Sequence, residues 1–568
     1  MKKFLLIIIL TFFSCNQNNS NSQLKKIINQ FENYKSNSKE EHPLGNYSEE
    51  SIQKYASFCQ NLLIDLKRIN ENNLSKDEKI SYELLKFVLK FKKLDYDFKK
   101  HWNPILSDSG FHSSLTYRVR PLTNKKSALE YLKILKAIPK YIEQQKNLIK
   151  KGLETGMGQP LIIFKGYEST YNQHITENAE QNFYFSPFLN LPKSLGQETI
   201  DSLKKAGKNI VEKMIIPTFK DVKLFFEEEY FIKTRREIGI SETPNGIEYY
   251  KNRIEYYTTL DYTPKEIHDI GLNEVKRIKK KMLDIIDKIN YKEGFDSFIK
   301  FLRSDPKFYS NSAEDLLINA RNISKKLDEQ LPRYFKTLPR KPYGVAPVPQ
   351  SIAPKYTAGR YVGTSANSSE PGYYWVNTYN LKSRPLYSLP ALTAHEAVPG
   401  HHLQGSLNNE LSNKIPKFRR NLYLSAFGEG WGLYSEFLAE EMGIYNTPYE
   451  HFGKLTYEMW RACRLVVDTG IHAFGWSREE AVNFMKSNTA LSIHEINTEV
   501  DRYISWPGQA LAYKIGELKI RSLRKKVEEN LKQNFDIREF HELILEKGTV
   551  TLPILERRVN QYIENYND

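Results

Sequence analysis

The chain has 568 residues, with 83 Lys and Arg against 68 Asp and Glu, which gives a formal net charge of +15. The lysines are spread along the whole chain between acidic residues, so we exclude a nucleic-acid-binding protein and assign the charge to solubility and attraction to a membrane surface. A hydrophobic content of 40% is ample for a core. Only Cys59 and Cys463 follow Cys15, so a disulfide framework and a thiolate zinc site are excluded, and two buried unpaired thiols are expected.

The N-terminus predicts export. Residues 1–14 form a signal peptide with a basic start, a short apolar run and a small residue before Cys15. This order is typical of a bacterial lipobox, although Phe12 stands where leucine is usual. We therefore expect Cys15 to be lipidated, residues 15–22 to form a tether, and the protein to be anchored in the bacterial cell envelope on the periplasmic side. The alternative is ordinary signal cleavage that discards Cys15.

Apolar residues recur at helical spacing through most of residues 23–335, with a loop-rich crossing over 152–195. Residues 340–382 differ, because they are rich in proline and glycine and because 372–378 alternates like a strand. From 391 onward the pattern is helical again. The sequence predicts a mainly α fold with two lobes, a helical N-terminal lobe over 23–335 and a catalytic lobe over 336–568.

The short strands precede a candidate metal-binding helix. An edge strand there could bind an extended peptide through its amides and carbonyls, and the alternative is a purely structural hairpin.

Residues 395–402 read His-Glu-Ala-Val-Pro-Gly-His-His. Two neutral imidazoles and a carboxylate can hold zinc with one position open for water, and a glutamate beside the first histidine can take a proton from that water. In the common H-E-x-x-H pattern the histidines lie one helical turn apart, but Pro399 occupies that position here. On a straight helix His401 would point about 120° away from His395, and His402 would lie about 10 Å along the axis.

The sequence therefore predicts a bulge at Pro399-Gly400, a type of irregularity that concentrates at functional sites. If the bulge absorbs two residues, His401 becomes the second ligand beside His395, and this is the register that we expect. His402 is the alternative.

The third ligand is expected in the segment Glu429-Gly-Trp-Gly-Leu-Tyr-Ser-Glu436. Its two glutamates are seven residues apart, which is two turns along one helix face. We expect Glu429 to bind the metal, because Gly428 and Gly430 beside it permit close backbone approach to a crowded site. Glu436 would then orient a ligand histidine by accepting its free N–H. The two assignments could also be exchanged.

These motifs, together with Asp468-Thr-Gly-Ile-His472 and Pro507-Gly-Gln-Ala-Leu-Ala-Tyr513, resemble the motif series of the bacterial "domain of unknown function 885" proteins. The resemblance implies a zincin-like protein similar in outline to helical zinc peptidases of the angiotensin-converting-enzyme and thimet-oligopeptidase type. Dipeptidyl peptidase III is a precedent for a lengthened zinc motif. The resemblance supports the metal site more than any particular substrate.

A zinc-dependent hydrolase that cleaves short peptides is the expected function. Glu396 is the expected general base, and it would later deliver its proton to the leaving amine. Tyr513 resembles the late tyrosine of helical zinc peptidases and is the expected donor to the oxyanion, with Tyr503 as the alternative. Arg502 is expected to bind a substrate carboxylate, or else to form a structural ion pair. His472 is another candidate donor, although a core role suits it better.

Two alternative functions remain open at this point. The first is an amide or ester hydrolase acting on a non-peptide substrate, because the same residues would serve. The second is a non-catalytic binding lipoprotein that holds a metal ion. Glu396 argues against the second, since a structural zinc site is closed by four protein ligands and needs no base.

Overall fold

The computed structural model describes residues 19–34, 41–350, 352–365, 368–411 and 414–567. The predicted signal peptide and Cys15 lie outside the described residues. Residues 19–32 are helical, so the last part of the segment expected to be a tether belongs to a helix. No helix in the described part of the chain is long and apolar enough to cross a membrane.

The chain is about 70% helical and divides into two compact units. Unit 1 comprises Met1–Leu74 and Leu85–Gly246, and unit 2 comprises Ser75–Leu84 and Ile247–Asp568. The mainly α prediction is confirmed. The division differs from the predicted lobe boundary near residue 335, because the helices of 247–335 pack within unit 2.

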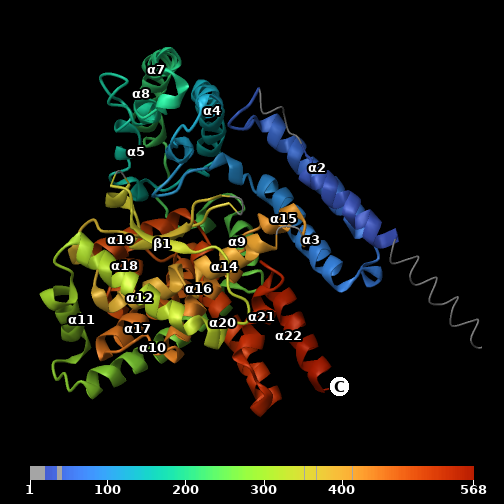
Figure 1. The fold of residues 1–568 in the computed structure, drawn as a ribbon, viewed down its shortest axis with the longest axis vertical. Coiled ribbons are helices and arrows are strands. Elements are labelled where there is room, and N and C mark those ends of the chain that lie inside the picture. The colour runs from blue at the N-terminus through green and yellow to red at the C-terminus, as the bar shows by residue number, and fades with distance from the viewer. Residues whose placement is uncertain (1–18, 35–40, 351, 366–367, 412–413, 568) are drawn as a thin grey trace, which may run out of the picture. The chain divides into compact units, whose positions relative to one another are not determined.

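Unit 1 is built mainly from helices (Figure 1). In its core the ring of Phe226 packs against those of His112, Tyr167 and Tyr171. The predicted loop-rich crossing over 152–195 is confirmed, since beyond the end of α4 at Glu154 this stretch contains only very short helices. The helices of this unit are α2 (Glu49–Lys67), α4 (Lys125–Glu154), α5 (Ser169–Asn172), α6 (Ser186–Leu189), α7 (Gln197–Ile210) and α8 (Ile216–Leu224), with π-helical turns at Val211–Ile215 and Phe225–Tyr230, and α3 (Lys76–Asp97) contributes to both units.

Unit 2 holds the remaining helices and a small sheet. Its helices are α9 (Gly246–Thr258), α10 (Pro264–Lys288), α11 (Gly294–Ser304), α12 (Ala313–Tyr334), α13 (Leu389–Glu396), α14 (His401–Glu410), α15 (Lys417–Arg420), α16 (Ser425–Glu441), α17 (Pro448–Ala473), α18 (Arg478–Asn488), α19 (Ile493–Ser505), α20 (Ala512–Leu531), α21 (Ile537–Leu545) and α22 (Leu552–Asn567). Its strands are β1 (Tyr343–Pro347), β2 (Gly359–Val362) and β3 (Gly372–Val376).

Local sequence explains where the long helices of unit 2 begin. At α10, the side chain of Thr263 accepts the amide of Glu266 while Glu266 reaches back to the Thr263 amide, and Pro264 occupies the first turn. Thr447 and Glu450 form the same reciprocal cap at α17. Such caps satisfy amides that have no partner within the helix.

Close helix packing and a buried ionic cluster form the core of unit 2. A Cβ on Gly516 of α20 would lie 2.0 Å from the carbonyl oxygen of Ala426 on α16, so only glycine permits this approach. The ammonium of Lys514, which is fully buried, contacts Glu274, Glu458 and Glu517 within 3.0 Å. These ion pairs join α10, α17 and α20. They explain why α10 belongs to unit 2, which was not evident from its helical pattern.

The sheet lies directly before α13 in sequence and has the strand order β1-β3-β2. β1 pairs parallel with β3 from Tyr343 opposite Gly372, and β2 pairs antiparallel with β3 from Gly359 opposite Val376. The strand predicted at 372–378 is confirmed as β3, and β1 lies in the proline- and glycine-rich segment 340–382, whereas β2 was not predicted. Because β2 pairs with a strand on one side only, it leaves one backbone edge open beside α13.

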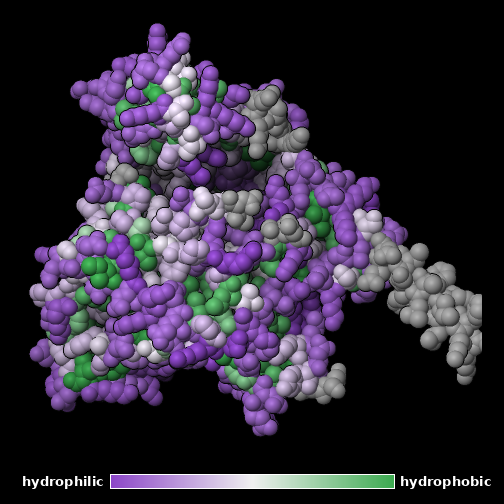
Figure 2. Space-filling view, viewed as in Figure 1, coloured by the Kyte–Doolittle hydropathy of each residue, from purple (hydrophilic) through white to green (hydrophobic). Residues whose placement is uncertain are grey.

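Cys59 and Cys463 are both buried and free, as expected from the cysteine count. Hydrophilic residues cover most of the face seen in Figure 2, and apolar residues form separate small patches there.

Candidate metal centre

The predicted metal-binding helix is broken into two helices. α13 ends at Glu396 and α14 begins at His401, with a four-residue loop between them. The Gly400 amide donates to the carbonyl of Ala394 at 3.0 Å, six residues back instead of the usual four. Two extra residues are thus accommodated, as the predicted register requires, but by a break between helices and not by a bulge within one helix.

Two contacts fix this loop. A Cβ on Gly400 would lie 1.9 Å from the carbonyl oxygen of His395, so glycine is required at this position. The indole Nε1 of Trp431 donates to the carbonyl oxygen of Pro399 at 2.8 Å, and both groups are buried. The loop is therefore held from α16, the helix that also carries Glu429.

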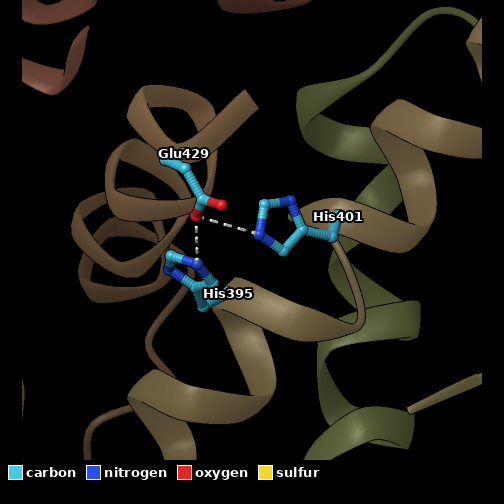
Figure 3. A group of neighbouring side chains, drawn as sticks. All are labelled: His395, His401 and Glu429. Carbon is cyan, nitrogen blue, oxygen red and sulfur yellow. Dashed lines mark ion pairs between the residues drawn. The ribbon is translucent and has the colours of Figure 1, made fainter. Parts of the chain in front are cut away.

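The side chains of His395, His401 and Glu429 converge (Figure 3). Oε2 of Glu429 lies 3.5 Å from Nε2 of His395 and 3.3 Å from Nε2 of His401. The three ligand atoms all lie within 4.8 Å of one another. Ligand atoms held about 2.1 Å from a tetrahedral zinc ion lie about 3.4 Å apart, so these spacings fit one such ion.

Glu436 orients the first histidine. Nδ1 of His395 lies 2.8 Å from Oε1 of Glu436, which leaves Nε2 facing Glu429. The same carboxylate oxygen is 3.2 Å from Nη2 of Arg461. A carboxylate on the far nitrogen of a ligand histidine fixes its tautomer and its ring orientation. The structure thus places Glu429 and Glu436 in the expected positions and not in the exchanged ones.

The electrostatics of the cluster reflect two imidazoles among buried carboxylates. Burial disfavours the charged form of His395, but the hydrogen bonds that its ring donates to Glu429 and Glu436 outweigh burial and raise the pKa of His395 to about 10. Burial also opposes ionisation of Glu429, yet His401 and His395 hold the pKa of this carboxyl well below its usual range. The site therefore favours an ionised Glu429 beside positive charge.

The glycines beside Glu429 have separate roles. A Cβ on Gly428 would lie 2.5 Å from the ring of Tyr423, and the Tyr423 hydroxyl donates to Oε1 of Glu429 at 2.8 Å. Gly430 instead lies at the crossing of α16 and α20, and Gly432 is the glycine that faces the metal centre. A Cβ on Gly432 would lie 2.6 Å from the ring of His395.

Neither Tyr423 nor Gly432 was singled out from the sequence. The glycine at every second position from 428 to 432 was the signal available for Gly432.

Glu396 is 8% exposed and contacts the sheet. Its Oε2 accepts the backbone amide of Tyr361, on strand β2, at 2.8 Å. The carbonyl of Ala358, just before β2, accepts a hydrogen bond from the backbone amide of Asn377, just after β3. Only alternate residues of an antiparallel strand bond to its neighbour, so the backbone N–H and C=O of Tyr361 point to the open edge. The edge strand and the expected general base are therefore directly linked.

His402 does not join the cluster. Its Nδ1 lies 3.2 Å from the hydroxyl of Tyr361 and 3.3 Å from Oγ of Ser406, and its ring packs against Tyr343. With 1% of its surface exposed, it connects α14 to the sheet.

Tyr513 and Arg502 lie together. Nη2 of Arg502 donates to Tyr513 at 3.4 Å and to Gln509 at 2.9 Å, and Nη1 lies 3.4 Å from Glu499. Tyr513 is one of the groups that raise the pKa of Tyr423, the residue that donates to Glu429. Arg502 thus contacts Glu499, Gln509 and Tyr513, and the described residues show no hydrogen bond from Tyr513 to His395, His401 or Glu429.

The two alternative donors are core residues. Tyr503 is 1% exposed, and its hydroxyl accepts from Trp460 and Arg464 at 2.9 and 3.0 Å. His472 is fully buried, with Nε2 2.9 Å from the carbonyl oxygen of Tyr503.

Fold and site together define a mainly α-helical protein with a candidate metal centre of two histidines and a glutamate at a helix break. The chain belongs to the family described as "Bacterial protein of unknown function (DUF885)", which it matches over residues 33–559. No curated protein matches it.

Two solved structures are similar to the chain. One is described as "the putative lipoprotein" from Colwellia psychrerythraea, with 27% identity and a TM-score of 0.86 over 97% of this chain and 100% of the other. The second is described as "a putative lipoprotein of unknown function" from Shewanella oneidensis, with 18% identity and a TM-score of 0.68 over 96% of this chain and 99% of the other. At that identity the second likeness concerns the fold alone.

Proposed function

We propose that this protein is a zinc-dependent hydrolase, a peptidase that cleaves short peptides. The observation that carries the proposal is the convergence of His395, His401 and Glu429 at 3.3 and 3.5 Å, with Glu396 next in sequence to the first of them. Imidazole and carboxylate ligands suit zinc among the common metals. Three protein ligands leave a position open, which is the arrangement of catalytic sites and not of structural ones.

The metal would supply Lewis acidity that acidifies water and polarises a carbonyl group. His395, His401 and Glu429 would hold it, and Glu436 would keep His395 in the tautomer with Nε2 free. Tyr423 would fix the second oxygen of Glu429, so that the carboxylate binds through Oε2.

Glu396 acts as the general base. The amide of Tyr361 holds Oε2, which leaves Oε1 to take a proton from the attacking water and return it to the leaving amine. Tyr513 donates its phenol proton to the oxyanion, because Arg502 donates to the phenol oxygen and leaves that proton for another acceptor.

Arg502 binds a substrate carboxylate together with Arg464. Both guanidinium groups contact Glu499, so two positive charges meet one carboxylate there. Nη1 of Arg464 is buried and has no hydrogen-bond partner among the described residues. A substrate carboxylate would supply the missing acceptor.

The open edge of β2 favours a peptide over other amides and esters. Tyr361, whose amide holds Glu396, is one of the residues whose backbone groups face this edge. An extended chain added to the edge would therefore pass the candidate metal centre.

Metal analysis and a short-peptide library test the proposal. We expect about one zinc ion per purified chain, cleavage of short peptides, loss of cleavage with a chelator and recovery with added zinc. Cleavage of only non-peptide amides or esters would replace the peptidase by the broader hydrolase. A zinc-loaded chain without any hydrolysis would favour a binding lipoprotein, and a chain that binds no metal would overturn the site itself.

The proposed location is the cell envelope, through lipidation of Cys15. The description of the Colwellia psychrerythraea structure as a "putative lipoprotein" supports it, as does the signal-like N-terminus. Membrane fractionation of the full chain should find the wild type with the membrane, and Cys15→Ala should release it. A wild type that is fully released, with an N-terminus beyond Cys15, would show that the anchor is absent.

A further inference from the structure

A cavity of about 240 Å³ lies in unit 2 beside the candidate metal centre. Elements distant in sequence form its wall, including α13, the loop before β2, and the segment from the end of α18 into the first turn of α19. The lining side chains include Leu392, Tyr309, Tyr387, Tyr457 and Glu495. None of the residues in the candidate metal centre is part of this wall.

The cavity adjoins Glu396 along two elements. Leu392 precedes Glu396 by four residues on α13, which is about 6 Å along the helix and on the same face. Ala358, another lining residue, precedes Tyr361 by three residues, or about 10 Å of extended strand. The open edge of β2 therefore runs from the general base to the mouth of the cavity.

The chemistry of the wall favours an uncharged occupant. Three tyrosines and several leucines line it. The guanidinium of Arg303 donates to the carbonyls of Leu491 and Thr489, both at 2.9 Å, and is thereby occupied. Arg384 similarly donates to two backbone carbonyls.

Glu495 opposes an anionic occupant, and Arg384 and Lys382, which also line the cavity, oppose a cationic one. Burial raises the pKa of Glu495 to about 7, so its carboxyl is partly neutral at physiological pH. A large uncharged side chain, above all an aromatic one, meets the fewest unfavourable contacts.

We propose that this cavity binds the side chain of a substrate residue on the amine side of the scissile bond, and that this residue is aromatic or large and apolar. The inference rests on the proposed peptidase function. A peptide added antiparallel to β2 runs from Tyr361 toward Ala358 in its own N-to-C direction, so the residues after the cleaved bond reach the cavity.

The test maps cleavage sites in a peptide library by mass spectrometry with the full, zinc-loaded chain. We expect Phe, Tyr and Leu to be enriched on the amine side, with kcat/KM about tenfold or more above that for Ala, Asp or Lys. Ala358→Trp and Ala490→Phe each fill the cavity from a different wall. Both should lose the Phe preference while they keep their zinc and their activity on Ala peptides.

Ile318→Trp is the control, because it places the same large aromatic side chain at a residue of α12 that is 53% exposed. It should retain the preference. Cleavage without enrichment, or enrichment that survives in both folded filling variants, would overturn the cavity assignment alone. If no peptide is cleaved by the zinc-loaded wild type, the proposed function fails and this inference fails with it.

Discussion

Glu396→Gln is expected to retain about one zinc ion per chain and to reduce kcat for peptide hydrolysis by about two to four orders of magnitude. The side-chain oxygen of the introduced glutamine can still accept a hydrogen bond from the backbone amide of Tyr361, so the local geometry is preserved. It has no basic oxygen to take the proton from water. Metal content by mass spectrometry and steady-state kinetics on the same preparation measure both effects.

Glu410→Gln is the control for this substitution. Glu410 lies on α14 and pairs with the exposed Arg340, so its loss should change neither zinc content nor rate. A Glu396→Gln chain with wild-type kcat would show that another group is the base. Loss of zinc in Glu396→Gln would instead give this glutamate a role in binding the metal.

His401→Ala is expected to abolish zinc binding, whereas His402→Ala should retain about one zinc ion per chain. The reason is geometric, because Nε2 of His401 lies 3.3 Å from Glu429 while His402 contacts Tyr361 and Ser406. Removing a ligand from a three-ligand site leaves too few donors for stable binding. The measurement is zinc content at equal folded fraction, determined by circular dichroism.

His402→Ala serves as the matched control, since it removes the same side chain one residue away. We expect it to lose some activity, because His402 supports the strand whose amide holds Glu396. Zinc lost only in His402→Ala would reverse the assignment of the two histidines. Zinc retained in both variants would mean that neither is a ligand.

Much of the fold could be predicted from hydrophobic periodicity. The helical pattern and the alternation at 372–378 identified mainly α structure with a small β-element. β2 could not be predicted, because its four residues are too short for an alternating pattern to stand out. The boundary at residue 246 was also missed, because it depends on tertiary ion pairs such as Lys514 with Glu274, which no local pattern encodes.

The candidate site was also predicted in part from the sequence. The residues that the structure brings together were selected from chemistry and spacing, since Pro399-Gly400 marks where a helix cannot continue. The contacts of Tyr361, Tyr423 and Gly432 were not foreseen. The first acts through its backbone amide, and the other two act because of where α16 packs, so their side-chain types carried no distinctive signal.

The two sides of the metal centre respond differently to changes in chain length. On α16, Glu429 and Glu436 act in a fixed register, and one inserted residue between them would turn Glu436 by about 100° relative to Glu429 and away from His395. In the loop 397–400 the amide of Gly400 bonds to a carbonyl six residues back, two more than in an α-helix, and Trp431 holds the loop from outside. When sequences of this family are aligned, gaps are therefore compatible with the loop and incompatible with the segment from 429 to 436.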